Sequence, residues 1–337
     1  MTDTPDISCI MALSDGPQAA ATALSIRSLM HQSHGHFELI LVDHGASETT
    51  RAVLRGFDDA RIVHVPMADD GQCTARNRGL SVARGGYVCF LDPGDTRPPW
   101  ALADMARHMA DAPDCIFAPG LHRRADGAVG HGGDLRHFQA LRAAGLAHPA
   151  AATGMTTVDT LYHLACLDRH VAGKLVRRDF LQAHGLCFPG GLGQGDILFH
   201  HAILMNLRRH ALATQPGHVL ATPQPAPGRA RFDYISVTGD LLELFARSQH
   251  FQDGVLRLLV LASVARMLQD GATGLSHEYS SDYRHAVQMV LARIDPRYAN
   301  PLKPAQHKLA LSHAPWVAGA LLYLQRLRGQ GSQQAPS

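Results

Sequence analysis

The sequence predicts an α/β protein with a doubly wound, mostly parallel sheet, followed by a helical C-terminal extension. Short apolar runs alternate with amphipathic segments four times before residue 100, which is the pattern of parallel strands joined by helices. The run at 37–42 (FELILV) has little polar alternation, which indicates a strand covered on both faces. Beyond a linker candidate at 223–228 (PQPAPG), the pattern is almost wholly helical.

The length, net charge and cysteine pattern of the chain exclude some classes of protein. The chain has 337 residues, a formal net charge of +2 and 22 scattered histidines. This length suffices for one large or two modest domains, and the nearly balanced charge argues against a nucleic-acid-binding protein. The six cysteines form no CxxC pair, and no signal peptide or transmembrane-length apolar stretch is visible. We therefore expect a cytoplasmic protein with reduced cysteines.

The individual elements follow from apolar periodicity and from turn and cap residues. Ser47 is the expected cap of its helix. The region 119–154 is rich in Gly and His, and we expect a hairpin or loop at 121–133. Strands are predicted at 7–13, 37–42, 61–65, 87–91, 114–118 and 218–221. Helices are predicted at 19–32, 48–57, 74–83, 100–109, 134–146, 172–184, 196–206, 238–249, 254–270, 282–294, 305–311 and 315–328.

The last predicted helix, 315–328, pairs an apolar face with Arg326 and Arg328. It could make peripheral contact with a membrane surface, or it could pack against the preceding helices. Residues 330–337 are expected to be disordered.

The stretch at 85–100 (GGYVCFLDPGDTRPPW) places two carboxylates at the end of a predicted strand. The apolar run 87–91 is bounded by two glycines, and Asp92 and Asp95 follow it directly. Ligands of open α/β sheets bind at the carboxyl ends of the strands, and carboxylates there suit a divalent cation that holds phosphate. Asp-Pro-Gly-Asp is also a good turn sequence, so a plain turn is the alternative.

Several motifs occur in an order that resembles one family. They are 7–11 (ISCIM), 37–43 (FELILVD) with Gly45 and Ser47, 75–77 (ARN), 87–95 with Pro99, 174–180 (KLVRRDF), 188–189 (FP) and 195–196 (GD). Together they resemble the inverting glycosyltransferases of family 2, which have the A-type nucleotide-diphospho-sugar transferase fold. The resemblance covers residues 7–205. The expected regions are a nucleotide-sugar-binding half at 1–118, an acceptor-binding half at 119–225, a C-terminal helical region at 226–329 and a tail at 330–337.

The resemblance implies an enzyme that moves a sugar from a nucleotide-diphosphate donor to a hydroxyl acceptor with inversion, in surface polysaccharide or glycoconjugate synthesis. Asp92 and Asp95 would hold Mn²⁺ or Mg²⁺ on the diphosphate. Asp196 matches the carboxylate that deprotonates the acceptor, although a plain helix cap is the alternative. The family's donor contacts fall on Ala12, Ser14, Asp43, His44, Arg76 and Asp92.

The resemblance also bears on the partners of the chain. The expected acceptor is a glycan, a lipid-linked sugar or a protein, and no nucleic acid partner is expected. A homodimer could form.

Three donor-contact positions depart from the family pattern. Ser14 stands where an aromatic ring usually stacks on the base, and His44 stands where a second Asp usually reads it. Gly94 replaces the usual metal-contacting Asp, so Asp95 or a histidine such as His200 or His201 would have to take its place.

A fourth change, at Gly195, removes the Glu that usually precedes the base. The scaffold motifs at 75–77 and 174–180 are intact. A catalytically inactive domain of the same fold, binding a glycan or a protein, is therefore the alternative. A nucleotidyltransferase is disfavoured because 14–17 contains no Lys or Arg.

Overall fold

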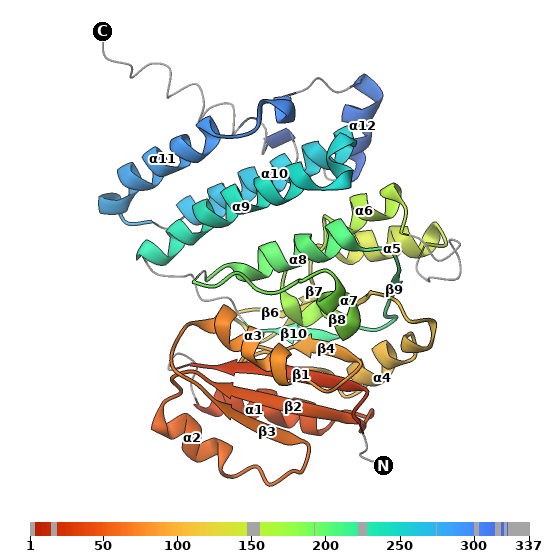
Figure 1. Ribbon diagram of the computed structural model, residues 1–337, viewed down its shortest axis with the longest axis vertical. Coiled ribbons are helices and arrows are strands. Elements are labelled where there is room, and N and C mark those ends of the chain that lie inside the picture. Colours follow the sequence, from red (N-terminus) through yellow and green to blue (C-terminus); the bar gives the residue numbers. More distant parts are fainter. Residues whose placement is uncertain are drawn as a thin grey trace. The chain divides into compact units, whose positions relative to one another are not determined.

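The computed structural model describes residues 4–14, 19–146, 156–191, 193–221, 228–273, 275–299, 303–313, 318, 319 and 322. The chain divides into two compact units, one from Met1–Thr157 and Leu167–Pro223 and the other from Val158–Cys166 and Gln224–Ser337. The first unit is α/β and the second is helical (Figure 1), which confirms the predicted fold class. The finer division at 118, 225 and 329 stays a prediction.

The first unit is built on a sheet of seven described strands in the order β3-β2-β1-β4-β8-β5-β9. Neighbours pair in parallel except at β8, which is antiparallel to both β4 and β5. All residues of β1 are buried, as expected for a central strand. The strands are β1 (Ile7–Leu13), β2 (Phe37–Asp43), β3 (Ile62–Pro66), β4 (Tyr87–Phe90), β5 (Cys115–Phe117), β8 (Lys174–Arg177) and β9 (His210–Leu212).

Helices connect these strands. Ser47 caps α2 by accepting the Thr50 N–H at 3.2 Å, as predicted. The helix α3 contacts both β1 and β2, so it lies next to the centre of the sheet. The helices are α1 (Ala19–Met30), α2 (Glu48–Leu54), α3 (Gln72–Val82), α4 (Ala101–Ala106), α5 (Leu135–Ala143), α7 (Arg178–Ala183) and α8 (Gly195–Asn206), with 3-10 turns η1 (Met109–Asp111) and η3 (Val171–Gly173).

A second, smaller sheet of the first unit has the described order β10-β6-β7. The strands β6 (Gly120–Arg123) and β7 (Val129–His131) are antiparallel, which confirms the hairpin expected at 121–133. The strand β10 (His218–Leu220) pairs in parallel with β6. An isolated bridge between Thr96 and Val219 connects β10 to the segment after β4.

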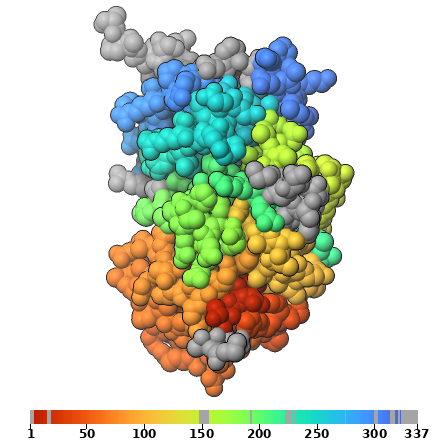
Figure 2. Space-filling model, turned by 45° about the vertical axis from the view of Figure 1, so that its right-hand side comes forward, coloured from red at the N-terminus to blue at the C-terminus, as the bar shows by residue number. Residues whose placement is uncertain are grey.

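The helix predicted at 172–184 is wrong in its first half. The structure has η3, then β8, and only then α7. Leu175 and Val176 are fully buried between β4 and β5, so pairing on both sides overrides the local pattern. On the face shown in Figure 2, the orange surface of N-terminal residues and the green surface of residues in the second half of this unit are contiguous. The short strand β9 was not predicted at all.

Two adjacent glycines before β4 differ in the room they leave for a side chain. A Cβ at Gly85 would lie 2.5 Å from the Ser8 nitrogen, whereas a Cβ at Gly86 meets nothing closer than the Asp6 carbonyl oxygen at 3.8 Å. Because β1 fixes the Ser8 backbone, Gly85→Ala is expected to lower the free energy of unfolding by about 1–3 kcal/mol. The matched variant Gly86→Ala should change it by less than about 0.5 kcal/mol. Urea unfolding measures both, and equal midpoints would contradict the clash.

The second unit is helical, and α10 is its centre. The helix α10 contacts α6, α9, α11 and α12. Asp253 caps α10 by accepting the Leu256 N–H at 2.8 Å, and Tyr162 of α6 donates to the same carboxylate at 3.0 Å. The helices are α6 (Val158–Leu164), α9 (Asp233–Arg247), α10 (Gly254–Ala272), α11 (His277–Ala292) and α12 (Pro304–His313), with 3-10 turns η4 (Gly228–Phe232), η5 (Gln249–Gln252) and η6 (Pro296–Ala299).

Within the described residues, none of the helices combines the length and the apolar character needed to span a bilayer. The predicted helix at 315–328 falls almost wholly outside the described residues, and the tail at 330–337 falls entirely outside them.

Candidate active site

The predicted donor-contact residues meet at the carboxyl edge of the large sheet. Because β1 pairs in parallel with β2 and β4, Ser14, Asp43 and Asp92 all stand at the same ends of neighbouring strands. Ala12 is buried within β1 and is 4% exposed, so its side chain packs inside the sheet. This edge is where open α/β sheets bind ligands.

Asp43 and His44 already have protein partners. Asp43 accepts the Arg51 Nε–H at 2.7 Å and the Ala46 N–H at 2.8 Å. Burial raises the pKa of Asp43, but Arg51 and the backbone N–H groups lower it more, so the net pKa lies below its usual value. His44 Nδ1 lies 3.0 Å from a carboxylate oxygen of Asp69. Donor contacts by Asp43 and His44 stay predictions.

The ARN motif at 75–77 lies on α3, and its three side chains have different surroundings. Ala75 is fully buried, and Arg76 is 2% exposed with its guanidinium at the site. The Asn77 side chain donates to the Phe188 carbonyl at 2.8 Å and accepts the Phe188 N–H at 2.9 Å. Asn77 therefore fixes the loop that leads into α8.

Arg76 joins the two carboxylates that the sequence assigns to the donor side and to the acceptor base. Its Nη2 donates to both oxygens of Asp92 at 2.8 Å, and its Nη1 donates to Asp196 Oδ1. Burial raises the pKa of Asp92, but Arg76 and His170 outweigh it, and the net pKa is lowered. The guanidinium also lies over the Phe188 ring, 5.1 Å from its centroid. Arg76 thus fixes the spacing of both carboxylates.

The start of α8 explains the departure at Gly195. Gln194, and not Asp196, occupies the cap position, and it makes no side-chain cap bond. Asp196 lies in the first turn and binds Arg76, so the plain-cap alternative is wrong. A Cβ at Gly195 would collide with Cys73 Sγ of α3. A side chain at this position, such as the Glu of the family, would therefore require the Cys73 side chain to turn away or α3 to move.

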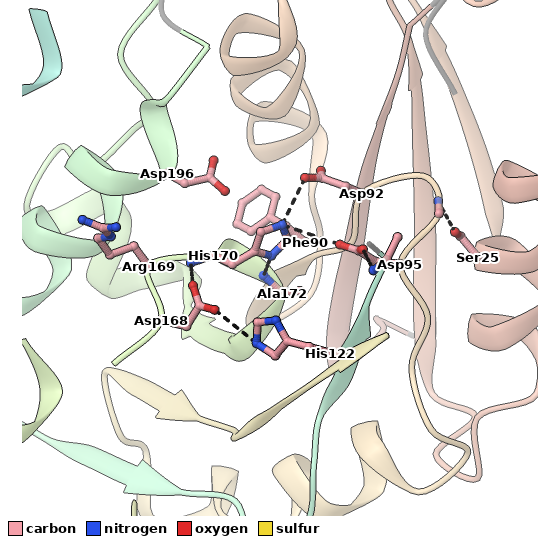
Figure 3. Close-up of polar contacts among 12 residues, drawn as sticks. Ser25, Phe90, Asp92, Asp95, His122, Asp168, Arg169, His170, Ala172 and Asp196 are labelled. Atoms are coloured by element: carbon pink, nitrogen blue, oxygen red, sulfur yellow. Dashed lines mark hydrogen bonds and ion pairs between the residues drawn. The ribbon is translucent and has the colours of Figure 1, made fainter. Parts of the chain in front are cut away.

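His170 brings an imidazole into the acidic cluster. Its Nε2 lies 3.6 Å from Asp92 Oδ2 and 3.6 Å from Asp95 Oδ2 (Figure 3). Its Nδ1 accepts the Ala172 N–H at 3.2 Å, which places the proton of the neutral ring on Nε2, facing the carboxylates. Sequence reasoning missed this residue because no motif spacing marks it among the histidines. Its one signal is its place four residues before the motif at 174–180.

Asp95, which the sequence predicts to be a metal ligand, is buried. It is 6% exposed, and its Oδ1 accepts the Ala221 N–H at 2.8 Å. Burial raises the pKa of Asp95 to about 6, assisted by Asp92 and opposed by His170. Its role in holding a metal stays a prediction.

The backbone explains the departure at Gly94. Its φ is +99°, and its N–H donates to the Ser25 hydroxyl at 2.8 Å. Residues with a side chain rarely adopt this conformation, so an Asp at this position would be strained. The turn after β4 therefore disfavours the usual metal-contacting carboxylate.

Asp92, His170 and Asp196 have the spacing of a metal site. Among the described residues, each offers one ligand atom within 4.8 Å of the others. His200 and His201 instead lie buried in α8, where His201 Nδ1 is 2.8 Å from the Ile197 carbonyl oxygen. The structure thus offers His170 for the role that the sequence suggested for His200 or His201.

Domains with a doubly wound sheet bind their ligands at the carboxyl ends of the strands, where this chain places carboxylates and a guanidinium. Residues 18–181 match the model of glycosyl transferase family 2. The putative teichuronic acid biosynthesis glycosyltransferase TuaG of Bacillus subtilis is 39% identical over 74 residues, which are 21% of this chain and 29% of TuaG. The match over residues 18–181 confirms the resemblance to family 2 glycosyltransferases that the motifs predicted.

A second relative extends the match along the chain. The putative glycosyltransferase EpsH of Bacillus subtilis is 24% identical over 193 residues, which are 56% of this chain and 51% of EpsH. The chain thus spans between 29% and 51% of the length of these two curated relatives.

Solved structures agree on the fold. Staphylococcus aureus TarS 1–349 in complex with UDP-GlcNAc has a TM-score of 0.67 at 14% identity, covering 97% of this chain and 92% of that chain. The mannosyltransferase PcManGT from Pyrobaculum calidifontis, in complex with GDP-Man and Mn²⁺, has a TM-score of 0.51 at 16% identity, covering 97% and 86%. At these identities the likeness shows the fold alone.

Proposed function

We propose that the first unit transfers a sugar from a nucleoside-diphosphate donor to a hydroxyl acceptor, with inversion at the sugar carbon. The observation that carries the proposal is the convergence of Asp92, Arg76 and Asp196 at the carboxyl edge of a family 2 domain. The relative TuaG is a putative glycosyltransferase of teichuronic acid biosynthesis, which supports a polysaccharide as the acceptor.

The geometry supports a distinct role for each of these side chains in the proposed reaction. The acceptor oxygen bonds to the anomeric carbon while the bond from that carbon to the diphosphate oxygen breaks. Asp196 takes the proton from the acceptor hydroxyl. Its side chain is 19% exposed, and Arg76 binds only its Oδ1, which leaves Oδ2 to face the acceptor. Arg76 keeps this carboxylate at a fixed distance from Asp92.

The charge of the site favours a divalent cation as cofactor. Two carboxylates, Asp92 and Asp196, bind one guanidinium, and a third, Asp95, lies 3.6 Å from His170. A diphosphate would enter as a further anion. Asp92, His170 and Asp196 are the residues that would hold Mn²⁺ or Mg²⁺, which neutralises a leaving diphosphate. His170 would bind through Nε2, so its proton would move to Nδ1 and the Ala172 N–H bond would be given up.

A non-catalytic domain of the same fold is the second candidate. The observation that favours it is that Asp43 binds Arg51 and His44 lies against Asp69, while the backbone disfavours a carboxylate at Gly94. Such a domain would bind a glycan or a partner protein and would show no affinity for a nucleotide.

A thermal-shift panel of UDP, GDP, CDP and dTDP, each with and without Mn²⁺ or Mg²⁺, separates the two candidates. Ligand at a hundredfold excess over its dissociation constant stabilises the folded state by about 2.7 kcal/mol. We expect one nucleotide to raise the melting temperature, and to raise it further with the cation. Absence of a shift with every nucleotide would support the binding module instead.

The same assay tests His170 as a ligand. We expect His170→Gln to require at least about tenfold more Mn²⁺ for the same nucleotide-dependent shift, because one of three proposed ligands is replaced. His64→Gln is the matched control, since His64 is exposed on the edge strand β3. Identical Mn²⁺ titrations for His170→Gln and the wild type would exclude His170 from the metal site.

A cytoplasmic location, membrane contact through 315–328, and a homodimer stay predictions.

A further inference from the structure

We propose that His122 and Asp168 form a subsite that binds a hydroxyl group of a neutral sugar acceptor, and this proposal rests on the transferase function proposed above. His122 lies on β6, and Asp168 lies just before η3. Their side chains are 37% and 36% exposed, so a ligand can reach both from solvent. His122 Nε2 lies 3.6 Å from Asp168 Oδ2 (Figure 3).

The separation of the two groups suits a bridging hydroxyl. A distance of 3.6 Å is too long for a direct hydrogen bond, yet a third atom can lie about 2.8 Å from both ends. A hydroxyl is both donor and acceptor, so it can donate to the carboxylate of Asp168 and accept from the Nε2–H of His122. Polar groups held across such a gap are commonly bridged by a water or a ligand oxygen.

Asp168 is held in place before any ligand arrives. Its Oδ1 accepts the His170 N–H at 3.0 Å, which leaves Oδ2 directed at His122. The buried Lys174 ammonium donates to the carbonyls of Asp168, Arg169 and His170 at 3.3, 3.2 and 2.7 Å. Burial raises the pKa of Asp168, but the His170 N–H and nearby positive charges lower it more, so it stays a carboxylate. A preformed carboxylate costs little ordering entropy on binding.

His122 is held in place from the opposite side. Its strand lies between β10 and β7, with Leu220 and Gly130 as its paired residues. A Cβ at Gly132 would lie 2.7 Å from His122 Nε2, so the ring packs directly over this glycine. The position of the imidazole therefore depends on the absence of a side chain at Gly132.

His170 connects this subsite to the acidic cluster. Its backbone N–H binds Asp168, while its ring faces Asp92 and Asp95 (Figure 3). A sugar held by His122 and Asp168 would thus lie beside the carboxylates of the proposed donor site, where an acceptor must lie for attack.

A cavity beside Asp168 is too small to hold the sugar itself. It has a volume of about 10 Å³ and is lined by Asp134, Asp168, Lys174 and His218, among others. This volume suits a single water and is far too small for a sugar ring. Neither nitrogen of the buried His218 has a hydrogen-bond partner among the described residues, and a water there would supply one. The sugar must therefore lie outside this cavity, and the Asp168 carboxylate that would meet its hydroxyl disfavours an anionic group at the same position.

Saturation-transfer NMR of the full chain with methyl β-glucoside, methyl β-galactoside and methyl N-acetyl-β-glucosaminide tests the subsite. We expect at least one glycoside to bind, and to bind at least about tenfold more weakly to Asp168→Asn and His122→Phe. Gly132→Ala should have the same effect by displacing the ring while keeping the imidazole. His131→Gln on β7 is the matched control and should bind normally, because His131 is paired with Leu121 and not with His122.

The outcomes separate this proposal from the transferase function. Glycoside binding that depends on His122 and Asp168, without any nucleotide shift, would keep the subsite and reject the transferase. Unchanged affinity in both variants, or no glycoside binding by the wild type, would overturn the subsite. If Asp168→Asn melts far below the wild type, Gly132→Ala decides the question, and normal glycoside binding by that variant overturns the proposal.

Discussion

Replacing Arg76 with methionine is expected to abolish sugar transfer and to lower the free energy of unfolding by about 3 kcal/mol. Arg76 is 2% exposed, and it is the charge that Asp92 and Asp196 share. Removing it leaves two facing carboxylates in a partly buried site, which costs more than the pair contributes when intact. We take the lower end of the usual range because the two carboxylates are 22% and 19% exposed. Urea unfolding and a transfer assay measure the two effects.

Three further variants test whether the loss of transfer and stability in Arg76→Met arises from charge, from geometry or from packing. Arg76→Lys keeps the charge but cannot bind both carboxylates in the same forked geometry, so transfer should still fall. Arg78→Met, on the exposed side of the same helix, should leave stability and transfer unchanged. Adding Asp196→Asn to Arg76→Met should recover part of the lost stability, because it removes one of the repelling charges. No recovery would show that the loss arises from packing and not from charge.

Replacing Asp196 with asparagine is expected to lower kcat by about 10²–10⁴-fold, because the acceptor hydroxyl loses its base. The free energy of unfolding should change by less than about 1 kcal/mol. Asn retains an oxygen that can accept from Arg76, and Asp92 still balances the guanidinium. The thermal shift with the donor nucleotide alone should remain while turnover is lost, and the further shift with Mn²⁺ should need a higher Mn²⁺ concentration because Asp196 is one of the three proposed ligands.

Asp179→Asn is the matched control for this experiment. Asp179 is also an acidic residue in the first turn of a helix, α7, but it is exposed and takes no part in the cluster. Normal transfer by Asp179→Asn together with loss in Asp196→Asn would assign the effect to the base and not to the helix dipole. Unimpaired turnover by Asp196→Asn would remove this residue from the mechanism.

The sequence predicted the central strands well because their apolar runs are bounded by glycines, turns and acidic residues. Strands were expected at 7–13, 37–42 and 87–91, and they lie at Ile7–Leu13, Phe37–Asp43 and Tyr87–Phe90. It failed at Lys174–Arg177, where Leu175 and Val176 are flanked by charged residues that suit a helix equally well. Only the pairing with β4 and β5 makes this segment a strand.

The structure, and not the sequence, explains two of the departures from the family pattern. In the sequence, Gly94 and Gly195 stand where the family usually has an Asp and a Glu, and no local pattern explains the change. In the structure, Gly94 has a positive φ, and Gly195 allows α8 to approach Cys73 of α3. Gly94 therefore permits the turn after β4, and Gly195 permits the close packing of α8 against α3.

The sequence by itself determined the fold class, the family motifs and the placement of Asp43, Asp92 and Asp196 near the ends of elements. These features depend on local patterns of apolar, turn and charged residues. The tertiary structure decided that Arg76 joins Asp92 to Asp196, and that His170, rather than His200 or His201, faces the carboxylates. Arg76 and Asp196 are 120 positions apart in the chain. Contacts over such separations depend on strand pairing and loop conformation, which no local pattern encodes.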